Sequence, residues 1–334
     1  MTQDYISPVP VEPSAQEPRR FVFVLLNEFT LFAVATATEC LRVANRMSGK
    51  QLYSWASTAE SLEPVVSSAG IAFPVDIPFD EVTRDDTLIV CGGLNIQSNS
   101  TAKTMGWLRK ISRQGVKIGS LCAGAHALAK AGLLDGHRAT IHWENQDGFI
   151  EDFPEIQLTR SVFAIDRNRF TAAGGTASID LMLRMIADDH GTGLSNAVAD
   201  QFIYSSIRTD QDFQRLSTPT RMGVRHPRLG QVIDLMEANI EEPVSPSELA
   251  ESVGMSTRQL ERLFRRYLDR SPKRYYMELR LGRARNLLMQ TDMSIINVAI
   301  ACGFSSPSHF SKCYRTHYGI TPYRERGSMG SSGS

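Results

Sequence analysis

The sequence predicts an α/β domain, a parallel sheet flanked by helices, followed by an all-α domain with two helix-turn-helix units. Three apolar runs, FVFVLL (21–26), TLIVCGG (87–93) and VKIGSL (116–121), are apolar throughout, as strands buried on both faces are. Helical stretches alternate with these runs, which favours a parallel sheet. From residue 226 onward the pattern is helical and contains an internal repeat. The 334 residues suit two domains.

The other segments follow from periodicity and composition. Between the strands we expect helices over 29–46, 101–113, 123–131 and 178–189. Residues 1–20 hold four prolines and few apolar residues, which predicts a disordered leader. The periodicity is lost over 209–225, a predicted linker, and the small polar tail 327–334 is expected to be disordered. The two domains should therefore span residues 21–208 and 226–326.

Composition excludes several classes of protein. Apolar residues make up 42% and charged residues 22%, as in ordinary globular proteins. No apolar run approaches the roughly 20 residues that a bilayer crossing needs, so no membrane partner is expected. The five cysteines form no C-x-x-C pair, which fits a reducing cytoplasm. His190 and His226 lack partners at metal spacing, so we expect neither a metal nor a cofactor.

The net charge of zero hides an uneven distribution. Residues 226–326 contain 15 Lys+Arg and 11 Asp+Glu, and within 258–285 ten basic residues face three acidic ones. A concentrated basic segment is the usual electrostatic sign of a nucleic-acid partner. A solvated helix face carries the same pattern, so charge alone leaves both interpretations open.

The internal repeat relates residues 247–272 to residues 296–322. Val253-Gly254 corresponds to Cys302-Gly303, and Phe264-Arg265 corresponds to Tyr314-Arg315. Each copy reads as a short helix, a turn with glycine, and a longer helix, which is the helix-turn-helix arrangement. Ser256 and Ser305 follow the turns and are expected to cap the second helices.

The second helix of each copy offers one apolar and one polar face. Leu260, Leu263, Phe264 and Tyr267 recur at helical spacing, so we expect them to be buried. The polar faces would enter the major groove. In the first copy the predicted DNA-binding residues are Arg258, Glu261 and Arg262, and Arg265 and Arg266 lie on the same face. In the second copy they are Pro307, Ser308, His309, Ser311, Lys312 and Arg315. The helix over 273–289 would join the two units.

Residues 228–324 resemble the AraC/XylS family of bacterial transcription regulators. The resemblance is carried by Met255-Ser256-x-Arg258-x-Leu260-x-Arg262, by Arg280-x-x-x-Ala284, and by Ile296-x-Val298-Ala299-x-x-Cys302-Gly303-Phe304 through Tyr318-Gly319-x-Thr321-Pro322. It implies a double-stranded operator as partner, and RNA polymerase as a second one. Two positions depart from the family pattern: Asp269, where glycine is usual, and Glu325, where an aromatic residue is expected.

The segment GSLCAGAHALAKAGLLDG (119–136) is typical of a nucleophile elbow. A strand ends at Leu121, Cys122 follows, and a helix opens with Ala123-Gly124. A helix N-terminus favours the thiolate, so Cys122 should ionise readily. His126 or His142 would have to act as the base of an enzyme, and a cysteine with a distant histidine is a weak signal on its own.

This first half, about residues 21–205, resembles the PfpI-like branch of the class I glutamine amidotransferase superfamily. The resemblance is carried by Cys91-Gly92-Gly93, Cys122-Ala123-Gly124, Ala139-Thr140-Ile141-His142-Trp143 and Gly174-Gly175-Thr176-Ala177-x-x-Asp180. Active members commonly have histidine directly after the cysteine, and some have an acidic residue where Ala33 stands. These departures favour a ligand sensor whose elbow is degenerate and holds no catalytic residue. The alternative is a cysteine-dependent amidase or hydrolase joined to a DNA-binding domain.

The expected effector is a small molecule over Cys122. Residues 171–191 and 195–208 are most similar to regulators of quaternary-amine catabolism, which respond to glycine betaine or carnitine; arginine-responsive regulators share the architecture. Trp143, with Phe29 or Phe149, would supply an aromatic wall, and the Cys122-Ala123 amides would hold a carboxylate. A catabolic activator that forms a homodimer through its N-terminal domain is expected. The predicted ligand-binding residues are Asn27, Phe29, Gly93, Cys122, Ala123, His142, Trp143 and Thr176.

Overall fold

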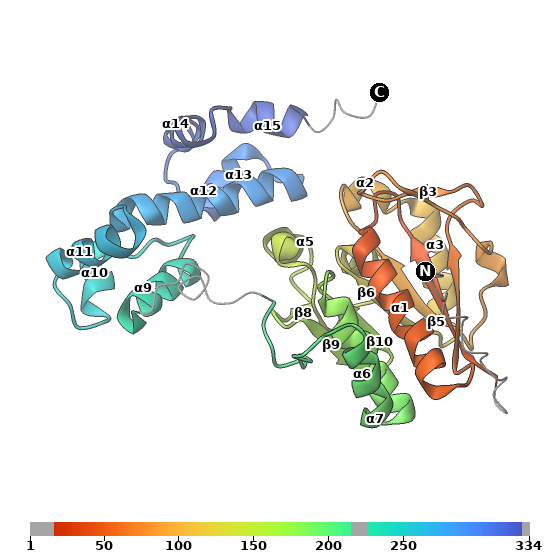
Figure 1. Ribbon diagram of the computed structural model, residues 1–334. Coiled ribbons are helices and arrows are strands. Elements are labelled where there is room, and N and C mark those ends of the chain that lie inside the picture. The colour runs from red at the N-terminus through yellow and green to blue at the C-terminus, as the bar shows by residue number, and fades with distance from the viewer. Residues whose placement is uncertain (1–16, 215–225, 329–334) are drawn as a thin grey trace, which may run out of the picture. The chain divides into compact units, whose positions relative to one another are not determined.

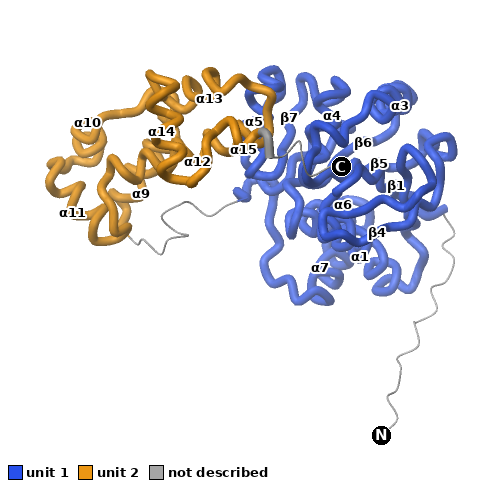
Figure 2. The backbone as a smooth tube through the Cα atoms, turned by 90° about the horizontal axis from the view of Figure 1, so that it is seen from above, with its two compact units in different colours: residues 1–214 blue, residues 215–334 orange. Residues whose placement is uncertain are grey.

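The computed structural model describes residues 17–214 and 226–328 (Figure 1). The chain divides into two compact units, residues 1–214 and 215–334, which are coloured separately in Figure 2. Each unit has hydrophobic cores of its own. In the part of the chain that the structure describes, no helix is both long and apolar enough to cross a membrane.

Unit 1 is built on a six-stranded sheet with the order β2-β1-β5-β6-β10-β9. Neighbouring strands are parallel except for the β9–β10 hairpin at one edge, so the predicted parallel sheet is confirmed. The expected runs form three of the strands, and β2, β9 and β10 add to them. The bounds are β1 (Arg19–Leu25), β2 (Tyr53–Thr58), β5 (Thr87–Cys91), β6 (Lys117–Leu121), β9 (Phe163–Asp166) and β10 (Arg169–Ala172).

Helices cover both faces of this sheet (Figure 1). Alternate residues of the 21–26 run enter different cores: Phe21 and Phe23 pack on one side, Val22 and Val24 on the other, which explains why the run is apolar throughout. The first core is closed by α1 (Leu31–Ser48), α6 (Ala177–His190) and α7 (Thr192–Gln201). The second is closed by α2 (Ile96–Asn99), α3 (Ala102–Ser112), α4 (Gly124–Lys130) and α5 (Gln146–Asp152).

Short elements complete unit 1 around the sheet. The antiparallel pair β3 (Val65–Val66) and β4 (Ala72–Phe73) forms a hairpin, and β7 (Arg138–Ala139) pairs in parallel with β8 (Gln157–Leu158). Two single-turn 3₁₀ helices, η1 (Phe79–Glu81) and η2 (Trp143–Asn145), lie in loops.

Three predicted boundaries need correction. Arg19 and Arg20 already pair in β1, so the predicted leader is too long at its end; residues 1–16 lie outside the described residues. Residues 209–214 bond to unit 1, so the linker predicted over 209–225 starts too early. Residues 327 and 328 end the last helix, and the rest of the predicted tail is not described.

The described residues of unit 2, 226–328, form helices and their connections, as predicted, with two helix-turn-helix pairs, α10–α11 and α13–α14, around a central helix. α12 contributes Tyr275 and Tyr276 to one core and Leu287 and Leu288 to the other, so it joins both pairs. The bounds are α9 (Pro227–Ala238), α10 (Pro246–Glu251), α11 (Thr257–Leu268), α12 (Pro272–Gln290), α13 (Ile295–Ala301), α14 (Pro307–Tyr318) and α15 (Pro322–Ser328).

The caps and buried face of the repeat follow the prediction with three exceptions, one of which is Leu263, predicted to be buried but only half-buried. Ser256 caps α11 in a capping box, but α14 is capped by Ser306 rather than Ser305, because Pro307 fixes the first helical position. Leu260 and Phe264 are fully buried, whereas Tyr267 is 39% exposed and Leu268 fills the core in its place.

The structure accounts for both departures from the family pattern. Asp269 has a φ of 53° at the end of α11, the left-handed conformation that aspartate tolerates better than most residues. Glu325 is buried, where it accepts hydrogen bonds from the Tyr314 hydroxyl at 2.5 Å and from Arg285 Nε at 2.8 Å. An ionic and hydrogen-bonded contact therefore replaces aromatic packing there.

Candidate ligand site and nucleic-acid interface

Four of the five loops that carry the predicted ligand residues start at one end of the sheet; the fifth, with His142 and Trp143, follows β7 in a separate two-stranded sheet. Strand register places Leu25, Cys91, Leu121 and Ala172 level with one another at the carboxyl ends of β1, β5, β6 and β10. The segments that follow these residues therefore leave the sheet side by side. In open α/β sheets, ligands commonly bind beyond the carboxyl ends of the strands.

Cys122 occupies a strained turn between β6 and α4. Its φ is 56°, and its amide donates to the Ala172 carbonyl at 3.0 Å. A side chain at Gly174 would put its Cβ 2.7 Å from Cys122 Cβ, so only glycine fits there. A Cβ at Gly124 would lie 2.2 Å from the Val90 carbonyl oxygen. The described geometry is that of a strand-to-helix elbow.

The Cys122 thiol differs from the reactive thiol that the elbow pattern predicts. Burial raises the pKa of Cys122, and this outweighs the hydrogen bonds from the Thr30 hydroxyl, 3.3 Å from the sulfur, and from the Ala123 amide, which lower it. The expected thiolate is therefore wrong: the group is a neutral thiol at physiological pH. Thr30 was missed because a hydroxyl residue after a strand carries no signal of its own.

Neither histidine is placed as a base. His126 packs edge-on against Phe153, with Nε2 3.7 Å from Asp152 of α5. His142 Nδ1 lies 3.6 Å from Glu144, and burial lowers the pKa of His142, so its ring is neutral at physiological pH. Among the described residues, neither ring is hydrogen-bonded to the Cys122 sulfur.

His142, Trp143 and Glu144 form one side of the site. Trp143 and Glu144 lie in η2 and His142 precedes it, and the rings of His142 and Trp143 lie 5.5 Å apart between centroids. Glu144 is 55% exposed, and its charge reaches Cys122, where it contributes to the raised pKa of the thiol. This loop thus brings a negative charge close to the elbow and carries an aromatic ring next to it in sequence.

Thr176 and a cluster that the sequence did not reveal form the other side. Arg208 Nη2 donates to Thr176 Oγ1 at 2.7 Å, and the same guanidinium binds the carboxylate of Asp180, which is fully buried. The Tyr204 hydroxyl donates to Asp180 at 3.0 Å. Arg208 lies far from Thr176 in sequence, so no motif could have predicted this pairing.

Several of the predicted ligand residues are buried or make contacts other than the expected ones. Phe29 and the alternative Phe149 are fully buried in the two cores, so they leave no face for a ligand and their role as an aromatic wall is corrected. The Cys122 amide donates to the Ala172 carbonyl and the Ala123 amide donates to the Cys122 thiol, so both elbow amides that were expected to hold a carboxylate are already hydrogen-bonded. Asn27 is exposed and its carbonyl accepts from Asn99, while Gly93 packs against the Glu28 carbonyl.

A separate small cavity lies at the opposite edge of the sheet. It is lined by Arg19 and Lys117, the first residues of β1 and β6, and by Arg167 in the β9–β10 turn. Arg19 is already paired with Asp189 at 2.6 Å. This cavity is remote from Cys122 and is no part of the candidate site. The described residues contain no cluster of three His, Cys, Asp or Glu side chains that could hold a metal ion.

The state of the thiol gives a testable expectation. Because burial raises the pKa of Cys122, its alkylation by iodoacetamide should be slower than that of a free thiol at pH 7 and should accelerate as the pH rises through 9 and above. Mass spectrometry of the Cys122 peptide measures the rate, with Cys122→Ser as the blank. Fast alkylation that is already complete at pH 6 would mean an activated thiolate.

In unit 2, the predicted DNA-contacting side chains stand on one exposed surface of each second helix. Arg258, Glu261, Arg262, Arg265 and Arg266 are exposed on α11. On α14 the exposed residues are Pro307, Ser308, His309, Lys312 and Arg315, with Ser311 half-buried. His309 Nε2 also lies 3.3 Å from the Cys313 sulfur.

Arg280 fixes the turn of the second helix-turn-helix. Its guanidinium donates to the carbonyls of Cys302 and Gly303 at 2.8 and 2.5 Å and lies 4.1 Å from the centroid of the Phe304 ring. A Cβ at Gly303 would lie 2.5 Å from the Ile240 carbonyl oxygen. This α12 arginine, singled out in the sequence, therefore orients α14 and has a structural role.

Family models match both halves of the chain. The DJ-1/PfpI family model matches residues 20–188, and the helix-turn-helix domain model matches residues 249–328. The chain belongs to the AraC-type transcriptional regulators that carry an N-terminal DJ-1/PfpI domain. It is therefore a sequence-specific DNA-binding regulator, and the fold predicted for each half is confirmed.

Similar proteins extend over nearly all of this regulator. The HTH-type transcriptional regulator GbdR of Pseudomonas aeruginosa is 47% identical over 95% of the chain and 86% of its own length. CdhR of the same organism is 45% identical over 92% of the chain and 91% of its own length. The crystal structure of an AraC family transcriptional regulator from Pseudomonas putida is 27% identical, with a TM-score of 0.51, over 55% of the chain and 100% of its own.

Proposed function

We propose that this regulator activates a catabolic operon in response to a quaternary amine that carries a carboxylate, such as glycine betaine or carnitine. The sensor unit (residues 17–214) would bind it over Cys122. The observation that carries the proposal is the pair of segments next to the elbow: a loop with the aromatic Trp143 and the acidic Glu144, and a contact between Thr176 and Arg208, whose guanidinium is paired with Asp180.

The cationic end of the effector fits the first side. A trimethylammonium group makes no hydrogen bonds, and proteins recognise it by aromatic faces and nearby negative charge. Trp143 is half-buried and Glu144 carries a carboxylate that is felt at Cys122. With Phe29 and Phe149 inside the cores, Trp143 is the aromatic residue of the predicted set that remains for this role.

The carboxylate end fits the second side. Arg208 keeps its charge, since its contacts with Asp180 raise its pKa despite burial, and its side chain is 27% exposed. Thr176 begins the 14-residue helix α6, whose N-terminus favours an anion. A small effector with a positive charge at one end and a negative charge at the other would contact the Trp143-Glu144 loop and the Thr176-Arg208 pair at once.

We further propose that the site binds its ligand without catalysing a reaction on it. A cysteine enzyme needs a thiolate, or a base that can take the proton from the thiol. Burial keeps Cys122 in the thiol form, and His142 is directed to Glu144. The positions of both groups support a sensor rather than an amidase.

The remaining partners are also proposals. The exposed side chains of α11 and α14 would read base edges in the major groove, Arg258, Glu261 and Arg262 in one half-site and Ser308, His309 and Lys312 in the other. A homodimer through the sensor unit is supported by exposed apolar side chains at its β3–β4 hairpin, Val66 and Ile71. RNA polymerase is the expected partner of an activator.

A thermal-shift screen tests the effector class. A ligand at 100 times its dissociation constant stabilises the folded state by about 2.7 kcal/mol. For a domain of this size that corresponds to a rise in melting temperature of about 5–10 °C. We expect glycine betaine or carnitine to give this rise and arginine to give none. A rise with arginine alone would move the effector to the amino-acid class, and no rise with any of the three would remove both classes.

A further inference from the structure

The last described residues of the sensor unit form a continuous strap. The strap, residues 208–214, follows α7 and its loop, and the chain then continues through 215–225 to unit 2. Ser161 and Phe213 form an antiparallel bridge, and the Gln214 amide donates to the Arg160 carbonyl at 3.1 Å. The strap is thus the part of the sensor that leads directly to the DNA-binding unit.

The first residue of the strap holds one side of the effector site. Arg208 donates from Nη2 to Thr176 Oγ1, and its amide and Nε both donate to the buried Asp180 carboxylate at 2.9 Å. Asp180 is on α6, one turn after Thr176. A ligand that contacts Thr176 or Arg208 therefore acts on the strap itself.

The last residue of the strap holds the other side. Gln214 Nε2 donates to the Thr140 hydroxyl at 2.8 Å, the Ile141 carbonyl at 2.9 Å and the Ser161 carbonyl at 3.1 Å. Ile141 directly precedes His142 and Trp143. The Oε1 atom of Gln214 is buried without a hydrogen bond, although buried polar groups are almost always satisfied. The missing hydrogen bond makes the bound position of Gln214 less stable, which favours positions in which the strap is released.

The middle of the strap reaches the elbow through one residue. The Val162 amide donates to the Asp212 carbonyl at 2.9 Å, and the Val162 carbonyl accepts from the Ala173 amide at 2.9 Å. Ala173 is followed by Gly174, which packs against Cys122. A displacement of the elbow loop is therefore passed to the strap by two consecutive backbone hydrogen bonds.

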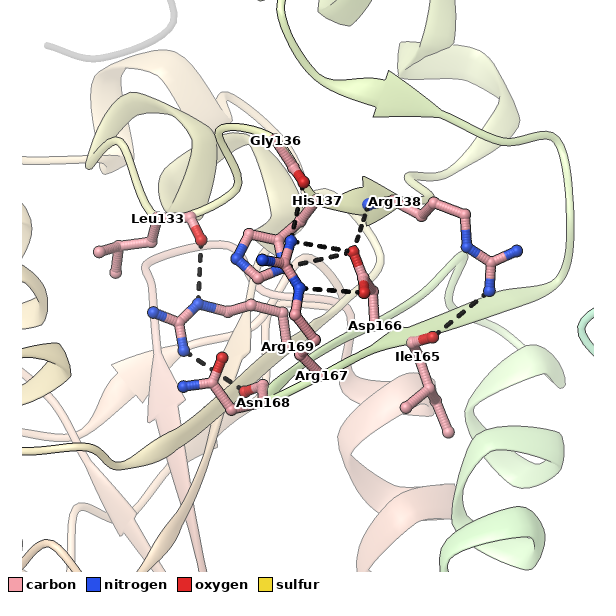
Figure 3. A network of polar contacts seen from close by, with 9 residues as sticks. All are labelled: Leu133, Gly136, His137, Arg138, Ile165, Asp166, Arg167, Asn168 and Arg169. Carbon is pink, nitrogen blue, oxygen red and sulfur yellow. Dashed lines mark hydrogen bonds and ion pairs between the residues drawn. The ribbon is translucent and has the colours of Figure 1, made fainter.

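The segment that carries Ile141 is fixed at its far end (Figure 3). The Arg138 amide donates to Asp166 Oδ2 at 3.0 Å, and Arg167 Nη2 donates to the Gly136 carbonyl at 2.8 Å, which ties β7 to the β9–β10 turn. With Arg138 held there and Ile141 bonded to Gln214, movement of the Trp143 loop is transmitted to the strap rather than absorbed along β7.

We propose that the strap is the element through which occupancy of the Cys122 site controls DNA binding by unit 2. The proposal rests on the proposed function for the identity of the effector. Both loops that would contact the two ends of the effector are bonded to the strap, one through Arg208 and one through Gln214. An effector that draws these loops together changes the equilibrium between a strap that is hydrogen-bonded to the sensor unit and a strap that is released from it. The strap leads to unit 2 along the chain, so this equilibrium would control DNA binding.

Replacing Gln214 separates this role from effector binding. Gln214→Ala removes three hydrogen bonds of the strap and none of the proposed ligand contacts. The matched control is Gln211→Ala, in the same strap, whose side chain is exposed. The full-length protein is used, with calorimetry for glycine betaine and fluorescence anisotropy for operator DNA. Gln214→Leu, which keeps the volume, and the melting temperature guard against a folding defect.

The expected result has two parts. Gln214→Ala should bind glycine betaine within threefold of wild type, yet shift operator affinity without effector by about fivefold or more, a typical coupling between sites, and lose the response to glycine betaine. Gln211→Ala should match wild type. Wild-type operator affinity and response in both Gln214 variants would overturn the strap proposal. If wild type binds no quaternary amine, the effector class fails, and the effector-free operator affinity of the Gln214 variants still decides on the strap.

Discussion

Replacement of Arg208 by alanine is expected to destabilise the sensor unit by about 3 kcal/mol, the largest effect we predict for a single side chain. The Asp180 carboxylate is fully buried and would lose the guanidinium that neutralises it. Removing one partner of a buried ion pair costs about 3–5 kcal/mol, because the other charge stays buried. The Tyr204 hydroxyl and the backbone amide at residue 208 still bind Asp180, which places the effect at the lower end.

Thermal unfolding of the full-length variant measures this loss. For a domain of this size, 3 kcal/mol corresponds to a fall in melting temperature of about 6–12 °C. The matched control is Arg184→Ala on α6, the helix that carries Asp180; its pair with Asp188 is about half exposed and should contribute less than about 1 kcal/mol. Adding Asp180→Asn to Arg208→Ala should restore part of the stability. Equal melting temperatures for Arg208→Ala and Arg184→Ala would show that the buried pair contributes no more than a surface pair.

The sheet and the helix-turn-helix repeat were predictable because their signals are local. The run at 21–26 is apolar because both faces of β1 are covered, and the Gly254 and Gly303 turns repeat at the same place in each copy. At the start of α14 a second local signal, the proline at the first helical position, decides which serine is the cap. Ser306 replaces Ser305 as a cap because Pro307 sets the helix start.

The candidate site was predictable only in part. Cys122 and Thr176 follow β6 and β10, whose carboxyl ends meet, so their loops could be grouped from the sequence, whereas Trp143 follows β7, which pairs with β8 in a separate two-stranded sheet. The balance between burial and helix N-terminus at the Cys122 thiol depends on desolvation, which needs the three-dimensional surroundings. Arg208 and Gln214 bond to residues 32 and 73 positions away, at Thr176 and Ile141, so no motif contains them.

Replacement of Trp143 by alanine is expected to weaken the effector about thirtyfold. A quaternary amine over a desolvated aromatic face gains on the order of 2 kcal/mol, and each 1.4 kcal/mol is a factor of ten in affinity. Trp143 lies between His142 and Glu144 in the loop beside the elbow, on the sensor unit. Operator affinity without effector should stay within twofold of wild type, since unit 2 is unchanged. Trp55→Ala, at a 37% exposed position on β2, is the matched control and should bind effector as wild type does.

The most direct measurement of the central claim is calorimetric titration of glycine betaine into the wild-type protein and the Trp143→Ala variant. Saturable binding to wild type with one site per chain, weakened about thirtyfold by Trp143→Ala, is the predicted result. Equal affinities would return Trp143 to a structural role. No binding of glycine betaine or carnitine to wild type would contradict the claim that the loops around Cys122 form a quaternary-amine site.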